Sequence, residues 1–317
     1  MAAQLELGAQ GERYRGEIAS DLTVLRGWAW PYTVVNGVED GPRTTITAGI
    51  HGCEYVSIYA AMRLAQELDP HDVKGQVVVV PIVNLPSFWE RSAFVGPYDG
   101  KNLNRLFPGK STGTFSEALA YFAFNTFILP SDAYIDMHGG DLVEDLVPFS
   151  GYMAGSEVEE KSRAMAEAFG LPYIIQRIEG ASAPSGLTHT AAAQRGVASL
   201  LVEAGGYGQL TMPDVDLLVE GARRALIVTG NLTGDPTPPE PPRHLAHSEH
   251  FAAAHDGFWI ADVRAGDMVA AGQQLGRILS LTGEVLDTLA AARDGVIIFS
   301  TTSAAVKQDG LLLNLGS

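Results

Sequence analysis

The sequence predicts an α/β fold, a mixed sheet with helices on both faces, followed by a small all-β domain. Three observations support this prediction. Short apolar runs alternate with helical patterns between about residues 43 and 232. A proline-rich segment then interrupts the chain, and beyond it regularly spaced glycines separate short β-like runs. Alternating strands and helices are typical of α/β sheets, whereas successive short strands with glycine turns are typical of all-β domains.

The α/β part contains short apolar runs that are rich in β-branched or small residues, as strands are. These runs are at residues 43–50, 76–83, 132–137, 172–177 and 197–202. Helices are expected at residues 53–68, 114–127, 157–169 and 214–229. The first of them has an apolar face, and the last begins directly after Met212-Pro213-Asp214, which is a helix start signal.

Polar side chains follow four of the predicted strands. His51 follows the run 43–50, Asn84 follows 76–83, His138 follows 132–137 and Glu203 follows 197–202. In open α/β sheets, ligands bind beyond the carboxyl ends of the strands. We therefore expect the active residues at one edge of the sheet.

The chain divides at residues 233–242, which hold five of its 17 prolines and cannot form a helix or a central strand. We expect a catalytic domain at 1–235, a linker at 236–243 and a β domain at 244–317. In the last segment Asp256-Gly257 is repeated 38 residues later as Asp294-Gly295. This pattern resembles the barrel-sandwich fold of biotinyl and lipoyl carriers. The hairpin 280–294 lacks the lysine that such carriers need, so we reject a carrier and expect a lid or an assembly surface.

Composition excludes several classes of partner. The net charge of −16 argues against binding to nucleic acid or to anionic membranes. A single cysteine allows no intramolecular disulfide, which fits a reducing cytoplasm. Residues 1–21 lack the apolar segment of a secretory signal, and the aliphatic run around 77–80 is far shorter than the roughly 20 residues that span a bilayer. We expect a cytoplasmic protein.

A metal site is predicted by His51-Gly52-Cys53-Glu54. A histidine and a carboxylate three residues apart point the same way as a helix begins, and zinc accepts nitrogen and oxygen ligands. A hydrolytic site needs a third ligand, and His138 at the end of a strand is the candidate. A lone histidine is usually a core or surface residue, but the combination favours one metal centre. Asp136 could hold a ring nitrogen of a ligating histidine or serve as a turn carboxylate.

Two further segments carry candidate residues. Residues 97–109 have the Asp-Gly and Pro-Gly pairs of a surface loop, yet Asn104 beside Arg105 also suits recognition of a carboxylate. Glu203 ends an apolar strand, where a buried carboxylate needs a partner. It is either the general base that activates water or a salt-bridged residue at the end of a strand.

Other residues have simpler interpretations. Cys53 is expected to be a small packed side chain rather than a nucleophile. Residues 180–184 are not a G-x-S-x-G elbow, which disfavours a serine hydrolase. The histidines at 244, 247, 250 and 255 fit a solvated linker better than a second metal site. His189 and Arg195 cannot be placed from the sequence.

Four blocks in this order resemble the succinylglutamate desuccinylase/aspartoacylase family of the zinc carboxypeptidase-like superfamily: HGCE (51–54), NLNRLFPG (102–109), DMHGG (136–140) and VEAGG (202–206). The resemblance covers about residues 43–232, and a barrel-like tail also occurs in relatives. It implies that one Zn²⁺ is held by His51, Glu54 and His138. It also implies that Asn104 and Arg105 bind and polarise the substrate, and that Glu203 activates water.

The resemblance also concerns two further positions. Many members of the family carry an arginine before the Asp-Gly turn, and Arg91 is the nearest candidate for this substrate-binding residue. The family often has aspartate where this chain has Asn102, which affects the hydrogen bonding of the loop.

Together these features predict a zinc-dependent deacylase, a hydrolase of linear amides, acting on an N-acyl amino acid or related small molecule with a carboxylate. A zinc carboxypeptidase acting on short peptides stays open as the alternative. A binding module without catalysis is disfavoured, because all proposed active positions carry competent side chains. A homo-oligomer is left open, since the tail could form a subunit interface.

Overall fold

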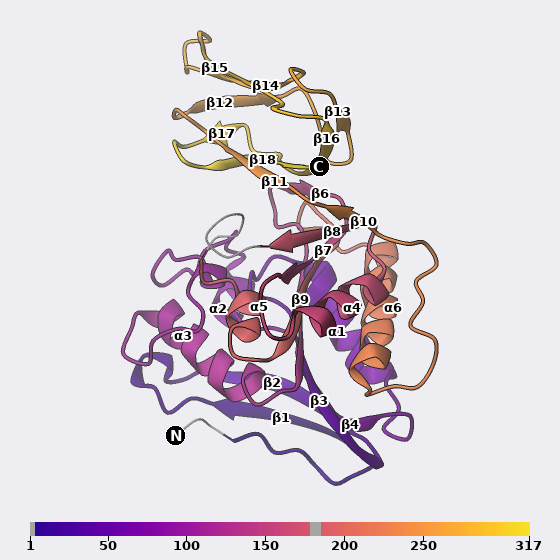
Figure 1. The fold of residues 1–317 in the computed structure, drawn as a ribbon. Helices are drawn as coiled ribbons and strands as arrows, with labels where there is room; N and C mark the ends of the chain where they lie inside the picture. Colours follow the sequence, from indigo (N-terminus) through magenta and orange to yellow (C-terminus); the bar gives the residue numbers. More distant parts are fainter. Residues whose placement is uncertain (1–3, 178–184) are drawn as a thin grey trace.

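The computed structural model describes residues 4–177 and 185–317, so the segment 180–184 considered above lies outside the described residues. Its larger part is built on a mixed sheet of nine described strands (Figure 1). In order across the sheet these are β1 (Arg13–Ala19), β2 (Ala29–Asn36), β4 (Lys74–Val80), β3 (Glu39–Thr47), β5 (Ala133–His138), β9 (Ala198–Glu203), β7 (Phe149–Met153), β8 (Tyr173–Arg177) and β10 (Arg243–Leu245).

The centre of the sheet consists of four adjacent parallel strands. β3 pairs in parallel with both β4 and β5, and β5 pairs in parallel with β9. Their carboxyl ends therefore meet at one edge, as predicted. The sheet is mixed because β2 runs antiparallel to β4, and β7 runs antiparallel to β9.

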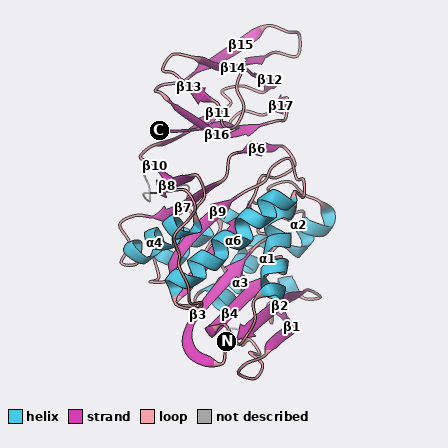
Figure 2. Cartoon of the chain, turned by 90° about the vertical axis from the view of Figure 1, so that its right-hand side faces the viewer, coloured by secondary structure: helices cyan, strands magenta, loops and turns pink. Residues whose placement is uncertain are grey.

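Helices cover both faces of this sheet (Figure 2). They are α1 (Tyr55–Glu67), α2 (Leu85–Glu90), α3 (Phe115–Ala123), α4 (Glu159–Phe169), α5 (Thr188–Ala193) and α6 (Met212–Thr229), with short turns η1 (Thr23–Leu25), η2 (Leu103–Arg105) and η3 (Phe124–Ile128). Thr44 and Thr45 on β3 point to opposite faces. The Thr44 hydroxyl donates to Asn231, just after α6, whereas that of Thr45 donates to Phe127 O in η3.

The predicted strands and helices are all present, with bounds shifted by a few residues. β1, β2, β7, α2 and α5 were not predicted. Local sequence explains several helix ends. α3 begins with a capping box formed by Thr114 and Glu117, and α6 has Pro213 in its first turn. α6 ends at Gly230, whose φ of 93° lies in the left-handed region that glycine adopts without strain.

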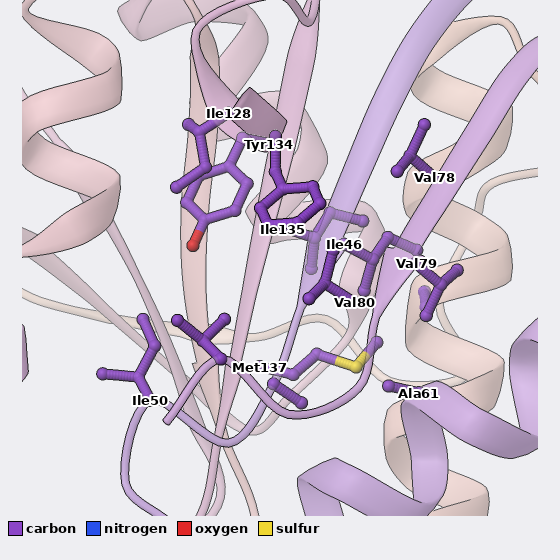
Figure 3. Packing of buried hydrophobic residues seen from close by; sticks show 14 of the residues in the cluster. Ile46, Ile50, Ala61, Val78, Val79, Val80, Ile128, Tyr134, Ile135 and Met137 are labelled. Atoms are coloured by element: carbon purple, nitrogen blue, oxygen red, sulfur yellow. The ribbon is translucent and has the colours of Figure 1, made fainter. Parts of the chain in front are cut away.

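The main hydrophobic core lies between the sheet and its helices (Figure 3). Val77, Val78, Val79 and Val80 on β4 are all fully buried, although successive residues of a strand point to opposite faces. A continuous aliphatic run is typical of a strand that is covered on both sides. On β5, Ile135 and Met137 extend this core.

The smaller part of the chain forms two β-sheets. One contains β11 (Ser248–Ala252), β18 (Leu311–Gly316), β16 (Gly295–Thr301) and β13 (Met268–Val269), and the other contains β15 (Val285–Ala290), β14 (Gln274–Leu279), β12 (Gly257–Ala261) and β17 (Ala305–Val306). β12 and β16 begin at the repeated glycines Gly257 and Gly295. A separate core that includes Trp259, Ile278 and Leu313 fills this part. The barrel-sandwich assignment stays a prediction.

The two parts are joined by shared strands and side chains (Figure 1). β6 (Glu144–Leu146), which follows β5 in the chain, pairs with β16 and so extends a sheet of the smaller part. Phe149, Ile175 and Leu201 of the large sheet form one apolar cluster with Val296 and Ile298 of β16. β10 pairs with β8 in the large sheet, although the predicted linker ends at residue 243. The domain limits stay a prediction.

No helix among residues 4–177 and 185–317 is long and apolar enough to cross a lipid bilayer.

One buried asparagine ties the ends of three elements together. The side chain of Asn231 donates to the carbonyls of Pro42 and Lys74, at 2.8 and 2.9 Å, and its Oδ1 accepts from the hydroxyls of Thr44 and Thr229. It is fully buried. These bonds connect the end of α6 to β3 and β4, and removal of the amide would break all four of them.

We expect Asn231→Ala to lower the free energy of unfolding by about 2–4 kcal/mol, because several buried polar groups lose their partners. Thr44→Val removes a single hydroxyl of similar shape and should cost about 1 kcal/mol. Chemical denaturation of both variants and the parent chain measures the difference. Equal losses for the two substitutions would contradict the role given to Asn231.

Candidate active site

The three predicted metal ligands come from the ends of two adjacent strands. His51 lies just beyond β3, Glu54 is the residue before α1, and His138 is the last residue of β5. β3 and β5 are hydrogen-bonded neighbours in parallel. The pairing therefore brings two imidazoles together although 87 residues separate them in the chain.

The Glu54 carboxylate lies between the two imidazoles. Its Oε1 is 2.6 Å from His51 Nδ1, and its Oε2 is 3.0 Å from His138 Nδ1. One ligand atom from each of the three residues lies within 4.8 Å of the others, and no other such group occurs in the described part of the chain. Two nitrogens and a carboxylate that converge in this way could hold a metal ion, and this donor set suits zinc.

Each imidazole contacts an acceptor through its other nitrogen. His51 Nε2 is 3.0 Å from Asn102 Oδ1, which also accepts from the Asn104 amide. Because that oxygen can only accept, the contact places the proton on Nε2 and leaves the Nδ1 lone pair free. His138 Nε2 is 3.2 Å from Asp136 Oδ2, which favours the same tautomer. Of the two interpretations of Asp136, this contact supports the one in which it holds a ring nitrogen.

Unpartnered atoms also fit a metal ion. Glu54 Oε2 and His138 Nδ1 are buried and lie 3.0 Å apart, yet neither makes a well-aligned hydrogen bond among the described residues. Buried polar atoms in native proteins nearly always have a partner, so these two point to a bound group. Burial alone would raise the pKa of Glu54, but the adjacent imidazoles outweigh it and hold the pKa below its usual value. The carboxylate is thus ionised, as a metal ligand must be.

Close packing fixes the loop that carries His51 and Glu54. A Cβ on Gly52 would lie 2.1 Å from the amide nitrogen of Phe88 in α2, so only glycine fits there. The Gly52 amide donates to Ser87 Oγ. Asn84, another residue at the predicted edge, caps α2 by accepting from the Ser87 amide and donates to Ile50 O. Asn84 thus supports the loop instead of lining the cavity.

Asn104 and Arg105 lie in the turn η2, beside the metal cluster. Asn104 Oδ1 accepts from both the amide and the hydroxyl of Thr188, and its Nδ2 lies 3.4 Å from His138 Nε2, a contact without a hydrogen bond when that nitrogen carries the proton. Arg105 donates to Asn104 O, and its side chain lines the cavity. Gly186 packs on this turn, because a Cβ there would lie 2.2 Å from Arg105 O.

Glu203 ends β9 and is paired in register with His138. Paired residues on neighbouring strands face the same side, so the carboxylate lies on the side of the metal cluster. Burial raises the pKa of Glu203 well above its usual range, and the nearby His138 offsets only part of this effect. Burial therefore makes this carboxylate a stronger proton acceptor, as general base catalysis requires.

A cavity of about 550 Å³ opens over these residues, a size suited to a small molecule. One wall comes from the large sheet and the loops at its edge. The other comes from the smaller part of the chain and includes His250, Phe299, Lys307 and Asn314. The smaller part therefore covers the site, in agreement with the expected lid.

Three charged residues that line the cavity were not predicted as site residues, Arg177, Glu144 and Lys307. Arg177 lies at the end of β8, and burial lowers its pKa to about 10. Its side chain passes over Gly151, where a Cβ would lie 3.3 Å from Arg177 Nε. Glu144 is the first residue of β6, a strand of three residues that the sequence did not reveal.

Comparison with known proteins places the chain in a family. Residues 40–228 match the catalytic domain of succinylglutamate desuccinylase/aspartoacylase. The chain belongs to the succinylglutamate desuccinylase/aspartoacylase family. It is 32% identical, over 91% of its length and 86% of the relative, to the N-alpha-acetyl-L-2,4-diaminobutyric acid deacetylase of Halomonas elongata.

Solved structures of similar proteins have the same architecture. The product-bound ectoine utilization protein EutE (DoeB) from Ruegeria pomeroyi is 27% identical, with a TM-score of 0.85 over 98% of this chain and 97% of that one. A succinylglutamate desuccinylase/aspartoacylase from Rhodobacter sphaeroides is also 27% identical, with a TM-score of 0.84 over 100% and 98% of the two chains. The shared fold thus extends beyond the catalytic domain of the family and includes the tail.

Several candidates considered for this family member lie away from the cavity. Arg91 is exposed and does not line it, so its substrate-binding role stays a prediction. His189 is buried in α5, and Arg195 lies over the ring of Phe124. His250 is the exception in the group after the proline-rich segment, because it lines the cavity. No second metal cluster is found among residues 4–177 and 185–317.

Cys53 lies between two of the proposed ligands and is fully buried. Burial raises the pKa of its thiol to about 11, so the reactive thiolate is nearly absent at neutral pH. This environment agrees with a packed side chain and not with a nucleophile.

We expect the thiol of this desuccinylase/aspartoacylase family member to be unreactive when folded. At pH 8 the native protein should react with a disulfide reagent over hours, and the unfolded protein should release one equivalent within minutes. Absorbance of the released thiolate measures both rates. Rapid reaction of the native protein would show that Cys53 is accessible and activated.

Proposed function

We propose that the protein is a zinc-dependent deacylase that hydrolyses the amide bond of an N-acyl amino acid. The observation that carries the proposal is the convergence of His51, Glu54 and His138 beside a cavity that also contains the Glu203 carboxylate. Membership of a family of deacylating hydrolases supports it.

In this proposal the metal is held by His51, Glu54 and His138, with Asn102 and Asp136 fixing the two rings. Zinc is favoured over other divalent metals by its preference for imidazole together with carboxylate. When bound, it supplies Lewis acidity that lowers the pKa of water and polarises a carbonyl group.

The chain's own residues move the proton and hold the substrate. Glu203 accepts a proton from the attacking water as the oxygen adds to the acyl carbon. As the C–N bond breaks, Glu203 returns that proton to the departing amine nitrogen. Arg105 binds and polarises the substrate beside Asn104, and Arg177 supplies a second guanidinium for a carboxylate. The products are a carboxylic acid and a free amino acid.

The dimensions of the cavity favour a small substrate. Its outer wall includes residues of β16 and β17, which bound the cavity on the side of the smaller part of the chain. A carboxypeptidase acting on short peptides uses the same metal and base and stays the alternative. The deacetylase from Halomonas elongata is named for an acetylated diamino acid, so such compounds belong in the substrate panel.

The metal prediction is tested by composition. We expect about one zinc per chain, and removal of it by a chelator should abolish amide hydrolysis. His138→Ala should lower metal content severely, because only two ligands remain. The matched control is His71→Ala, which removes an exposed histidine and should leave metal content unchanged. Full occupancy in His138→Ala would contradict the proposed ligand set.

The role of Glu203 is tested on a panel of N-acetyl and N-succinyl amino acids and short peptides. Glu203→Gln should keep the metal and lose about 10²–10⁴-fold in kcat, because the amide cannot accept a proton. Glu284→Gln, an exposed control, should retain full activity. Amine release measures the rates. Substantial hydrolysis by Glu203→Gln would refute the base, and cleavage of peptides in preference to acyl amino acids would favour the carboxypeptidase.

A further inference from the structure

Glu144 is a carboxylate in the cavity that the proposed chemistry does not use. It lines the same cavity as His51, Glu54 and Glu203 but is not part of the metal cluster. Its position on β6 places it where the smaller part of the chain meets the catalytic part.

Hydrogen bonds and strand pairing fix the backbone of Glu144. Its amide donates to Asp141 O at 3.0 Å, and its carbonyl accepts from the Tyr207 amide at 2.7 Å. On its other side it pairs in register with Thr301 of β16. The side-chain Oε2 accepts from the Asp141 amide at 2.8 Å. A carboxylate held in this way is preorganised to face the cavity.

The charge of Glu144 has no protein partner. Among the described residues, no lysine, arginine or histidine lies close enough to form an ion pair with it, and its charged neighbours are the acids Glu54 and Asp141 together with His51 and Arg105. Burial raises the pKa of Glu144 to about 8, so the empty cavity favours the protonated form and a bound cation favours the ionised form. A cationic group entering the cavity would supply the missing counter-charge and would form a charge-assisted hydrogen bond.

The cavity also contains groups of the opposite charge. Arg105 and Arg177 line it as well, and both are suited to a substrate carboxylate. The cavity thus offers guanidinium groups for an anion and a separate carboxylate for a cation. A neutral or purely anionic acyl amino acid would leave Glu144 without a partner.

Resting on the proposed function, we propose that Glu144 binds a positively charged amine of the substrate, so that the preferred substrates are N-acylated diamino acids. The acylated nitrogen belongs to the scissile amide, the carboxylate lies with the arginines, and the second, free ammonium donates to Glu144. This residue is a determinant of specificity and takes no part in bond cleavage.

The proposal is tested with two substrates of equal shape. Nα-acetyl-2,4-diaminobutyrate carries an ammonium where Nα-acetylnorvaline carries a methyl group. The parent enzyme should favour the charged substrate in kcat/KM by at least about 10-fold, the value of a charged hydrogen bond. Glu144→Gln keeps the acceptor for the Asp141 amide and removes the charge. It should lose about 10- to 100-fold on the charged substrate, mainly through KM, and change little on the other.

Asp145→Asn is the matched control, since Asp145 is the next residue of the same strand and does not line the cavity. It should leave the preference unchanged. Glu144→Asp keeps the charge and should retain part of the preference, whereas a merely structural role would predict equal losses on both substrates. Equal losses, or a parent enzyme without a preference for the charged substrate, would overturn the proposal.

The proposed function can fail separately. If the parent enzyme cleaves no acyl amino acid, the deacylase assignment is wrong, and calorimetry with free 2,4-diaminobutyrate and norvaline then decides the role of Glu144. Tighter binding of the diamino acid to the parent than to Glu144→Gln supports the cation site. Equal affinities of the two amino acids for both proteins would refute it.

Discussion

The carboxylate of Glu54 between two buried imidazoles is the arrangement on which the rest of the site depends. Charged and polar groups removed from water are costly unless they are paired. Here the parallel pairing of β3 with β5 brings His51 and His138 to the same carboxylate, and Asn102 and Asp136 hold the outer nitrogens of the rings. The geometry of the four central strands thus determines where a metal ion can bind and which nitrogens face it.

The cavity beside this cluster has a charge distribution that differs from that of the whole chain. The protein has a net charge of −16, which repels anions at long range. Arg105, Arg177 and Lys307 nevertheless line the cavity beside Glu54, Glu144 and Glu203, so an anionic group can reach positively charged donors there. Binding of an anionic group in this cavity would therefore depend on contacts at short range, which salt screens less than long-range attraction.

Much of the site could be predicted because its signals are local. His51 and Glu54 lie within four residues, and His138 and Glu203 each end an apolar strand that the sequence reveals. Arg177 could not be predicted in the same way. β8 runs antiparallel to β9, so its carboxyl end points away from the active edge, and only the long side chain passing over Gly151 returns to the cavity.

Glu144 and β10 could not be predicted from the sequence for a related reason. β6 has three residues and gains its strand geometry from pairing with β16, which lies more than 150 residues later in the chain. β10 likewise joins the large sheet by pairing with β8, directly after a proline-rich segment that gives no sign of a strand. Short strands of this kind are specified by their distant partners and not by their own periodicity.

The pairing of β6 with β16 also bears on how such proteins diversify. A tail that only covered a cleft could be exchanged between relatives as a separate module. Here the backbone of a cavity-lining acid is hydrogen-bonded into the sheet of the tail, so an insertion or register change in β16 would shift that acid as well. Sequence drift in the tail, far from the metal cluster along the chain, is thus a route by which selectivity can change while the catalytic groups stay in place.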